Sequence, residues 1–254
     1  MPRIRWSEAL APWLSLAVLL ALWQLASNLF QIPEFILPSP LAIGATLWQR
    51  GDAVLAHALD TLHSTTIGFA LAVVVGVVLG ALIGSFRLAH RAFYPLMVAF
   101  NTTPKVALVP VLVIWFGIGK VPAIITAFAI AFPPVAVNVA TGLATMEPEL
   151  KDVLRALGAS RWQIIAKVGL PQSLPYLFGS LKIALSLAFV GAVISETIAS
   201  NEGIGYLMVT ASSRLDVPMV FAGLFVTAGM GVALYAVFAA VEGRVTRWST
   251  LRSG

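Results

Sequence analysis

Long apolar stretches separated by short charged segments set the pattern of this 254-residue chain. Four stretches contain no acidic or basic residue, and they lie between Glu8 and Glu34, Asp60 and Arg87, Lys120 and Glu147, and Asp216 and Glu242. A helix needs about 20 apolar residues to cross the hydrocarbon core of a bilayer, and each stretch reaches or exceeds that length. The pattern therefore predicts an integral membrane protein.

Six membrane-spanning helices are predicted from the hydropathy of the chain. They lie near residues 11–30, 63–86, 92–116, 121–144, 176–199 and 218–241. The first stretch is free of charge from Ala9 to Pro33, which makes it longer than the apolar core of a signal peptide. We interpret it as a retained span, so residues 1–254 are predicted to form one all-α transmembrane domain.

The composition excludes several other classes of protein. Hydrophobic residues make up 59% of the chain and charged residues 11%, whereas soluble domains carry about 25% charged residues. The net charge of +5 comes from basic residues spread between the apolar stretches, so membrane-flanking loops explain it better than a nucleic-acid partner does. The absence of cysteine excludes disulfides and thiolate metal sites, and the scattered His57, His63 and His90 predict no metal site.

The distribution of lysine and arginine predicts the orientation of the spans. Six spans place both termini on one side of the membrane, and most basic residues fall in segments on that side: Arg3, Arg5, Arg87, Arg91, Lys151, Arg155, Arg161, Lys167, Arg244, Arg247 and Arg252. The opposite side carries only Arg50, Lys120 and Arg214. By the positive-inside rule, both termini are predicted to be cytoplasmic.

The predicted cytoplasmic loop at residues 147–171 has the features of two short helices. Pro148 suits the first turn of a helix, and Leu150, Val153, Leu154 and Leu157 follow at helical spacing. Gly158 is a typical helix stop, and Ser160 with Gln163 predicts a capping box for a second helix. Leu170-Pro171 and Pro175 are expected to end that helix. Periodicity alone leaves two interpretations open, a docking element for a soluble partner or helices lying in the membrane interface.

Polar groups inside the predicted spans mark a second region of interest. Charges are costly there and by default indicate a pathway or an ion pair. Lys105 lies about midway along the third span next to Pro104, and we consider three roles for it: lining an anion pathway, gating, or pairing with Glu196. Lys182 lies near the cytoplasmic end of the fifth span and is expected to snorkel. Gly76, Gly80 and Gly84 predict a close helix contact inside the bundle rather than a dimerisation motif.

The 147–171 loop resembles the cytoplasmic signature loop of ATP-binding-cassette (ABC) importer permeases. That signature has the form E-A-A, three residues, G, nine residues, I-x-L-P, and the matching positions are Asp152-Val153-Leu154, Gly158, Val168, Leu170 and Pro171. Asp152-Val153-Leu154 departs from E-A-A, which affects the expected fit to the ATPase. Further segments are similar to the nitrate/sulfonate/taurine-type branch, and they are Ile36–Pro40, Pro104 with Ala107 and Pro110, Trp115–Gly119, Ser195–Asn201 and Gly203–Leu207.

This resemblance implies a MetI-like permease fold in the bacterial cytoplasmic (inner) membrane. It implies a second permease copy, two ATPase subunits and an extracytoplasmic substrate-binding protein as partners, with ATP and Mg bound by the ATPases and no cofactor in this chain. The chain has no G-x-x-x-x-G-K-[ST] phosphate loop, and it is expected to be non-catalytic. The implied ATPase-coupling residues are Asp152, Leu154, Gly158, Ala159, Leu170 and Pro171, and the candidate pathway or gate residues are Pro104, Lys105, Glu196 and Asn201.

Alternative functions and the substrate stay open at this point. A secondary transporter would be expected to show an internal repeat, and a membrane enzyme would need convergent acids or histidines; neither pattern is evident. For an importer, small anions such as sulfonates, taurine, nitrate or carboxylates are the first substrate class that we expect. Vitamin precursors of the pyrimidine or riboflavin type are the alternative.

Overall fold

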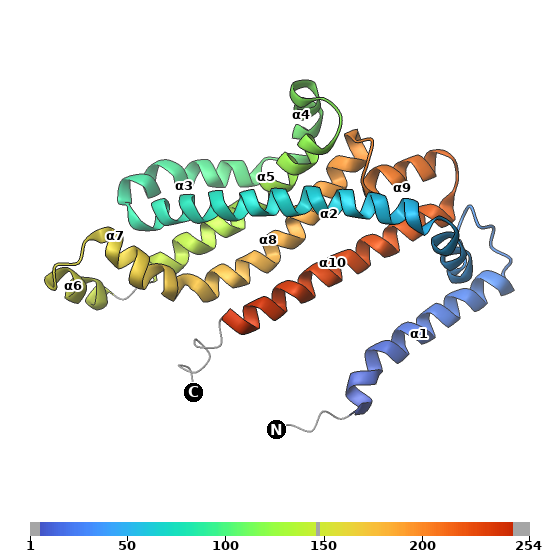
Figure 1. The fold of residues 1–254 in the computed structure, drawn as a ribbon, viewed down its shortest axis with the longest axis horizontal. Helices are drawn as coiled ribbons and strands as arrows, with labels where there is room; N and C mark the ends of the chain where they lie inside the picture. Colours follow the sequence, from blue (N-terminus) through green and yellow to red (C-terminus); the bar gives the residue numbers. More distant parts are fainter. Residues whose placement is uncertain (1–5, 146–147, 246–254) are drawn as a thin grey trace.

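The computed structural model describes residues 6–145 and 148–245, and every regular element in these ranges is a helix (Figure 1). Glu147 and the terminal Arg3, Arg5, Arg247 and Arg252 lie outside the described residues. The elements are α1 Trp6–Leu29, α2 Pro40–Ser85, α3 Arg87–Thr102, η1 Lys105–Leu108, α4 Val109–Phe116, α5 Lys120–Ala144, α6 Pro148–Ala156, α7 Arg161–Ile164, η2 Ile165–Gly169, α8 Leu170–Ala199, α9 Ile204–Ser213 and α10 Val217–Val245.

The predicted all-α membrane fold is confirmed. Among the described residues, four helical stretches are long and apolar enough to cross a membrane, and they are Pro40–Ser85, Lys120–Leu143, Tyr176–Ser213 and Val217–Arg244. A bent pair of helices, Leu88–Thr102 with Lys105–Phe116, makes a fifth span if it is counted as one, and Leu14–Leu29 is a shorter apolar helix. The structure thus has four such helices among the described residues, or five with the bent pair, where six spans were predicted, and the first predicted span corresponds to the shorter apolar helix.

The second predicted span is longer than expected, because α2 begins at Pro40 rather than near residue 63. The Ser39 side chain caps the helix by accepting a hydrogen bond from the Ala42 N–H at 3.2 Å, and Pro40 occupies the first turn, where its missing N–H costs nothing. The helix kinks at Arg50, whose φ of −125° and ψ of 23° are not helical. The hydropathy prediction did not include residues 40–62, because the charged residues in this part of α2 lower its mean hydropathy although they do not interrupt the helix.

The third predicted span is broken, so the expectation of one helix over 92–116 is wrong. Thr103 is extended, the conformation that the following Pro104 favours, and α3 ends at Thr102. The chain then turns through 85° into η1 and α4. The Phe100 ring, just before the break, lies 5.2 Å from the ring of Phe132, which is in the middle of α5. The break is therefore at about half the depth of the bundle.

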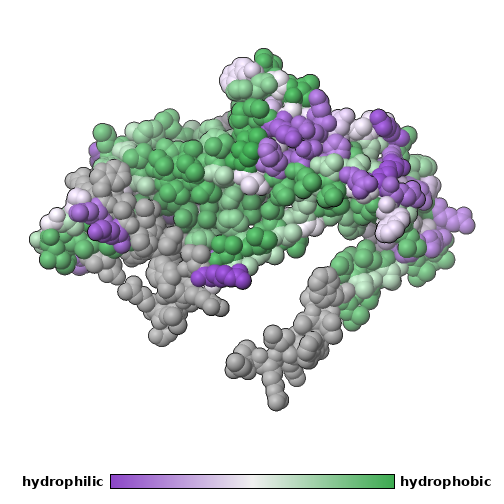
Figure 2. Space-filling model, viewed as in Figure 1, coloured by the Kyte–Doolittle hydropathy of each residue, from purple (hydrophilic) through white to green (hydrophobic). Residues whose placement is uncertain are grey.

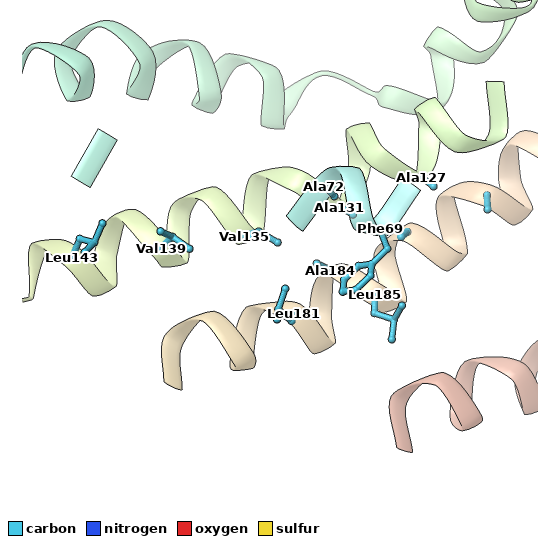
Figure 3. Close-up of a cluster of buried hydrophobic side chains, with 12 residues drawn as sticks. Phe69, Ala72, Ala127, Ala131, Val135, Val139, Leu143, Leu181, Ala184 and Leu185 are labelled. Carbon is cyan, nitrogen blue, oxygen red and sulfur yellow. The ribbon is translucent and has the colours of Figure 1, made fainter. Parts of the chain in front are cut away.

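The core of the bundle lies between α2, α5 and α8. Phe69, Ala131, Val135, Ala184 and Leu185 are among its buried side chains (Figure 3). These helices approach closely because α2 presents glycine to α5. A Cβ atom at Gly76 would lie 2.7 Å from Val135 Cβ, and one at Gly80 would lie 2.5 Å from the Ala136 carbonyl oxygen. The predicted glycine contact within the bundle is thus confirmed.

Candidate functional site

Polar side chains gather at the end of the molecule where α9 meets the beginning of α2, whereas the body of the bundle is mainly hydrophobic on its surface (Figure 2). The short loop between α8 and α9, residues 200–203, lies in this region and leads directly into the first turn of α9. Two groups of contacts hold the loop in place, one buried and one at the exposed rim.

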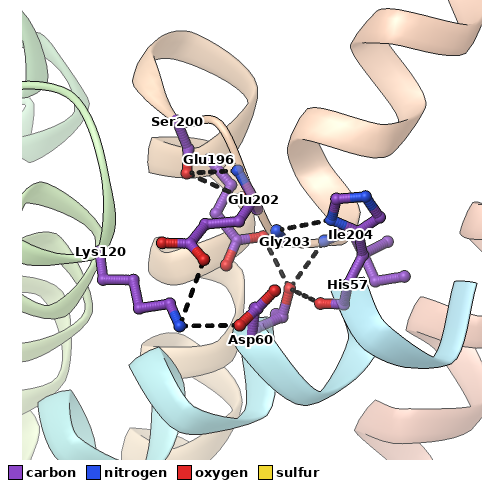
Figure 4. Close-up of polar contacts among 9 residues, drawn as sticks. His57, Asp60, Lys120, Glu196, Ser200, Glu202, Gly203 and Ile204 are labelled. Atoms are coloured by element: carbon purple, nitrogen blue, oxygen red, sulfur yellow. Dashed lines mark hydrogen bonds and ion pairs between the residues drawn. The ribbon is translucent and has the colours of Figure 1, made fainter. Parts of the chain in front are cut away.

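The buried group compensates for a helix end that has no cap of its own. The first N–H groups of a helix lack partners within the helix, and Gly203, at the cap position of α9, has no side chain to offer them. Side chains from other helices take this role (Figure 4). The Gly203 N–H donates to His57 Nδ1 at 3.1 Å, the Ile204 N–H donates to Thr61 Oγ1 at 2.8 Å, and the Gly205 N–H donates to Glu196 Oε2 at 3.2 Å.

Thr61 and Glu196 also bind each other, which joins α2 to α8. Thr61 Oγ1 donates to Glu196 Oε2 at 2.7 Å, and the two residues are 0% and 3% exposed. A buried carboxylate is costly unless hydrogen bonds satisfy it, and its position at the N-terminal end of α9 adds a favourable interaction with the helix dipole. We call His57, Thr61, Glu196 and the three N–H groups of residues 203–205 the outer latch.

Glycine is required where the loop passes Glu196. Gly203 has a φ of +94°, in the region that favours glycine. A Cβ at this position would come within 2.5 Å of Glu196 Oε1, and a Cβ at Gly205 would lie 2.7 Å from Glu196 Cβ. The two glycines therefore let the backbone N–H groups reach the carboxylate.

The second group is an ion-pair cluster at the rim, which we call the ionic clasp. Lys120 Nζ, at the start of α5, lies 2.8 Å from Asp60 Oδ1 on α2 and 3.3 Å from Glu202 Oε2 in the loop (Figure 4). Ser200 Oγ fixes the loop further by donating to the Glu202 carbonyl at 2.7 Å. The three charged side chains are 34%, 27% and 37% exposed, so water reaches the clasp but hardly reaches the latch.

The structure places the predicted gate residues unequally. Glu196, on α8, lies at the centre of the outer latch. Asn201 lies exposed in the loop of residues 200–203 that follows α8. Lys105 does not pair with Glu196, because the turn at Pro104 brings it back toward α3. Its Nζ donates to the Asn101 carbonyl at 2.7 Å and lies 5.5 Å from the centre of the Phe100 ring. A cation at the C-terminal end of α3 is favourable for the helix dipole.

His57, Thr61 and Lys120 were missed as site residues at the sequence level. Their partners are far away along the chain, with 143 positions between Thr61 and Ile204 and 146 between His57 and Gly203. The sequence predicted no metal site for His57 and did not indicate that its ring would accept a hydrogen bond in the latch. The glycines at 203 and 205 were the available signal that a backbone segment passes close to other groups.

The cytoplasmic loop has the predicted helix, stop and capping box. Gly158 has a φ of +81°, and the Gly158 and Ala159 N–H groups donate to the carbonyls of Arg155 at 2.9 Å and Leu154 at 3.0 Å. These two bonds make a Schellman motif that ends α6. In the capping box, the Ser160 N–H donates to Gln163 Oε1 at 2.8 Å and the Gln163 N–H donates to Ser160 Oγ at 3.3 Å.

The end predicted for the second loop helix is wrong. Leu170 and Pro171 open α8 instead of ending a helix, and α7, η2 and α8 follow one another without interruption from Arg161 to Ala199. Proline is tolerated in a first helical turn, and the intervening η2 is a π-helical segment. Nothing is described of the Leu170 and Pro171 side chains, so their predicted contacts stay predictions.

The two loop helices enclose a hollow at the end of the molecule opposite α9. Leu154, Gly158 and Ala159 line it from the α6 side, together with Ile164, Lys167 and Val168 beyond the capping box. Leu157 at its edge is 78% exposed and Val153 is 57% exposed. Asp152, a predicted coupling residue, is exposed and pairs with Arg155 at 3.1 Å. The loop therefore presents apolar and charged groups side by side.

Lys182 has a partner inside the bundle rather than only reaching the interface. Its Nζ lies 2.7 Å from Glu242 Oε2 on α10. Both side chains are 24% exposed. The pair links the first half of α8 to the last turn of α10.

Comparison with known proteins gives consistent matches over most of the chain. A family model described as a binding-protein-dependent transport system inner membrane component matches residues 72–247. The riboflavin transport system permease protein RibX of Chloroflexus aurantiacus is 33% identical over 250 residues, covering 98% of this chain and 93% of the relative. The formylaminopyrimidine transport permease protein ThiX of Halalkalibacterium halodurans is 31% identical over 242 residues, covering 95% and 96%. The taurine transport system permease protein TauC of Escherichia coli is 29% identical over 248 residues, covering 92% and 88%.

A solved structure shares the fold. The inward-facing MetNI methionine ABC transporter contains a chain that matches with a TM-score of 0.68 and 20% identity, covering 80% of this chain and 98% of that chain. At this identity the match supports the MetI-like arrangement of helices.

Proposed function

The chain belongs to the family of binding-protein-dependent transport inner-membrane components and is a permease subunit of an ABC importer; on that premise we propose that it moves a small solute delivered by an extracytoplasmic binding protein. Partner ATPase subunits would bind ATP and Mg and hydrolyse the nucleotide. The main observation that supports the proposal is the position of α8, because this one helix bears the cytoplasmic loop at one end and the outer latch at the other.

The cytoplasmic loop is proposed to dock in a groove on each ATPase. The Schellman motif and the capping box fix the angle between α6 and α7, so the loop is a shaped element rather than a flexible connector. The exposed Val153 and Leu157 supply an apolar ridge beside the charged Asp152 and Arg155. Such a surface suits insertion into a groove of a soluble partner.

A second copy of the chain is proposed to complete the pathway. Irregular backbone at membrane depth is tolerated only where protein buries it or where it lines an aqueous cavity. The break at Thr103 and Pro104 lies at about mid-depth and is exposed, and so are Asn101 and Thr102 before it. A homodimer in which the two breaks face a shared path would satisfy this requirement, and it would place Lys105 beside the path.

Two substrate classes have support. The cation of Lys105 near mid-depth favours a small anion, and one relative is named for taurine. Relatives named for riboflavin and formylaminopyrimidine support a vitamin precursor instead. In either case the binding protein would select the solute.

Transport by the assembled complex tests the proposal. The chain would be purified with its ATPase and binding protein, reconstituted in liposomes, and supplied with taurine, an alkanesulfonate, riboflavin or an aminopyrimidine. We expect ATP-dependent uptake of one class and hydrolysis that the loaded binding protein stimulates. Uptake driven by an ion gradient without ATP would contradict the proposal.

The proposed orientation places both termini in the cytoplasm and the outer latch outside. A reporter fused after residue 205 is expected to be external. Activity of that fusion in the cytoplasm would overturn the orientation without affecting the transport proposal.

A further inference from the structure

Resting on the proposed transport function, we propose that Thr61 and Glu196 are positioning residues that hold the outer end of the permease closed, and that α8 withdraws Glu196 from α9 when the cytoplasmic loop moves. The outer latch is thereby the part of the molecule that converts movement at the ATPase side into opening on the outside.

The hydroxyl of Thr61 is the junction of the outer latch. It accepts the hydrogen bond from the Ile204 N–H at 2.8 Å and donates to Glu196 Oε2 at 2.7 Å, so one buried group ties α2 to both α8 and α9. Replacing this hydroxyl with a methyl group of similar shape removes both of these interhelical bonds, together with the contact to the His57 carbonyl oxygen at 3.2 Å within α2. A serine would retain both, which makes Thr61→Ser a matched control for Thr61→Val.

A continuous helical stretch connects the latch to the cytoplasmic loop. Glu196 lies in the last turn of α8, and the stretch from Arg161 to Ala199 contains no break. At 1.5 Å per residue, α8 alone is about 45 Å long, so tilting or sliding it at the inner end displaces the carboxylate at the outer end. The N–H groups of α9 would then lose the Glu196 cap that they have in the closed arrangement.

The latch is better suited to this role than the ionic clasp. Exposed ion pairs contribute about 0–1 kcal/mol and are screened by salt, and the members of the clasp are about one third exposed. Thr61 and Glu196 are almost fully buried, and a buried polar group that loses its partner costs about 1–3 kcal/mol. Opening should therefore depend on the latch and only weakly on salt.

The absence of cysteine from the chain makes a direct test possible. Ser195 precedes Glu196 on α8, is 1% exposed, and its hydroxyl has no hydrogen-bond partner among the described residues. A Ser195→Cys substitution thus reports on the opening of this region at little structural cost. The measurement is the labelling rate by a membrane-impermeant maleimide added from outside to the complete complex.

We expect Thr61→Val to raise the resting labelling rate of Cys-substituted position 195 at least tenfold, because the substitution removes two buried interhelical hydrogen bonds, while Thr61→Ser leaves it unchanged. Nucleotide trapping should raise the rate in the Ser195→Cys protein, and Gly158→Val should abolish that response without changing the resting rate. Equal labelling of the valine and serine variants, in complexes that assemble equally well, would overturn the inference. Absence of ATP-driven uptake in the Ser195→Cys protein and the unmodified protein alike would instead refute the proposed function.

Discussion

Thr61 Oγ1 lies 2.7 Å from Glu196 Oε2, although 135 positions separate these residues along the chain. The contact joins the outer half of α2 to the last turn of α8, and both residues also bind N–H groups of α9. Three helices are therefore held together by one carboxylate and one hydroxyl, both of which are almost fully buried. This arrangement leads to predictions for the latch, the clasp, the loop, the helix contact and the mid-depth lysine.

Removing the carboxylate of Glu196 should destabilise the protein more than neutralising it. Glu196→Ala leaves the Gly205 N–H without its acceptor and leaves the Thr61 hydroxyl only the His57 carbonyl at 3.2 Å, at a cost of about 1–3 kcal/mol. Glu196→Gln keeps a carbonyl oxygen in the same place and should lose less. Thermal unfolding of the purified complex in detergent measures the difference, and equal midpoints for the two variants would contradict this account of the outer latch.

The ionic clasp is expected to contribute little. Lys120→Met removes both ion pairs, but their exposure to water keeps the loss of stability small. Uptake should fall less than in Thr61→Val, and the difference between Lys120→Met and the unmodified protein should shrink at high salt. A larger effect of Lys120→Met at high salt than at low salt would be inconsistent with this role.

Gly158 should be sensitive to backbone conformation rather than to size. Its φ of +81° is costly for most residues, by about 1–2 kcal/mol, although no atom lies within 4 Å of a Cβ built there. Gly158→Val is therefore expected to distort the loop and to uncouple ATP hydrolysis from uptake while membrane insertion stays normal. Asparagine tolerates this conformation, so Gly158→Asn should couple better than valine. Normal uptake by Gly158→Val would remove Gly158 from the coupling role.

Two glycines of α2 provide a matched pair for the helix contact. Gly80→Ala would place a Cβ 2.5 Å from the Ala136 carbonyl oxygen of α5, whereas Gly44 has no atom within 4 Å of its Cβ position. We expect Gly80→Ala to lower the thermal stability and the yield of folded protein. Gly44→Ala should be neutral or stabilising, by up to about 1 kcal/mol, because alanine favours helices. Equal stability of both variants would mean that α2 and α5 are packed less closely than described.

Lys105 offers a test of the substrate class. If the transported solute is an anion, Lys105→Met should reduce its uptake without changing the association with the ATPase, and Lys105→Arg should retain most of the activity. The lysine also caps the Asn101 carbonyl, so thermal stability is the control for a purely structural effect. Unchanged uptake by Lys105→Met would exclude this residue from the pathway.

Features encoded by neighbouring residues were predictable from the sequence. The helix stop at Gly158 and the capping box of Ser160 and Gln163 depend on contacts within five residues, and the structure contains both. The apolar stretches likewise predicted the four long membrane helices, although they did not reveal the break in the third predicted span. Pro104 was a signal for the break after Thr102, since proline disfavours a helical residue before it, but Pro95, Pro133 and Pro134 lie inside continuous helices. The apolar residues on both sides of the break gave one continuous hydropathy peak.

The contacts of the outer latch could not be predicted from a single sequence. His57 and Thr61 lie on α2, and their partners at residues 203–205 follow more than 140 positions later. Which side chain caps α9 is decided by the packing of α2 against α8, and that packing places Thr61 rather than Lys105 beside Glu196. Glu196 was among the predicted gate residues, and the glycines at 203 and 205 were a signal of close approach, but the residues that Glu196 contacts could not be predicted.

The π-helical segment η2 has a consequence for the angle at which the loop is presented. Each residue of an α-helix turns the chain by about 100°, and a π-helical turn holds one residue more than an α-helical one. Deleting a single residue from Ile165–Gly169 would let α7 and α8 join as one regular helix and would swing α6 around the axis of α8 to face a different direction. The span would be unaltered, yet a partner below the membrane would meet the wrong side of the loop.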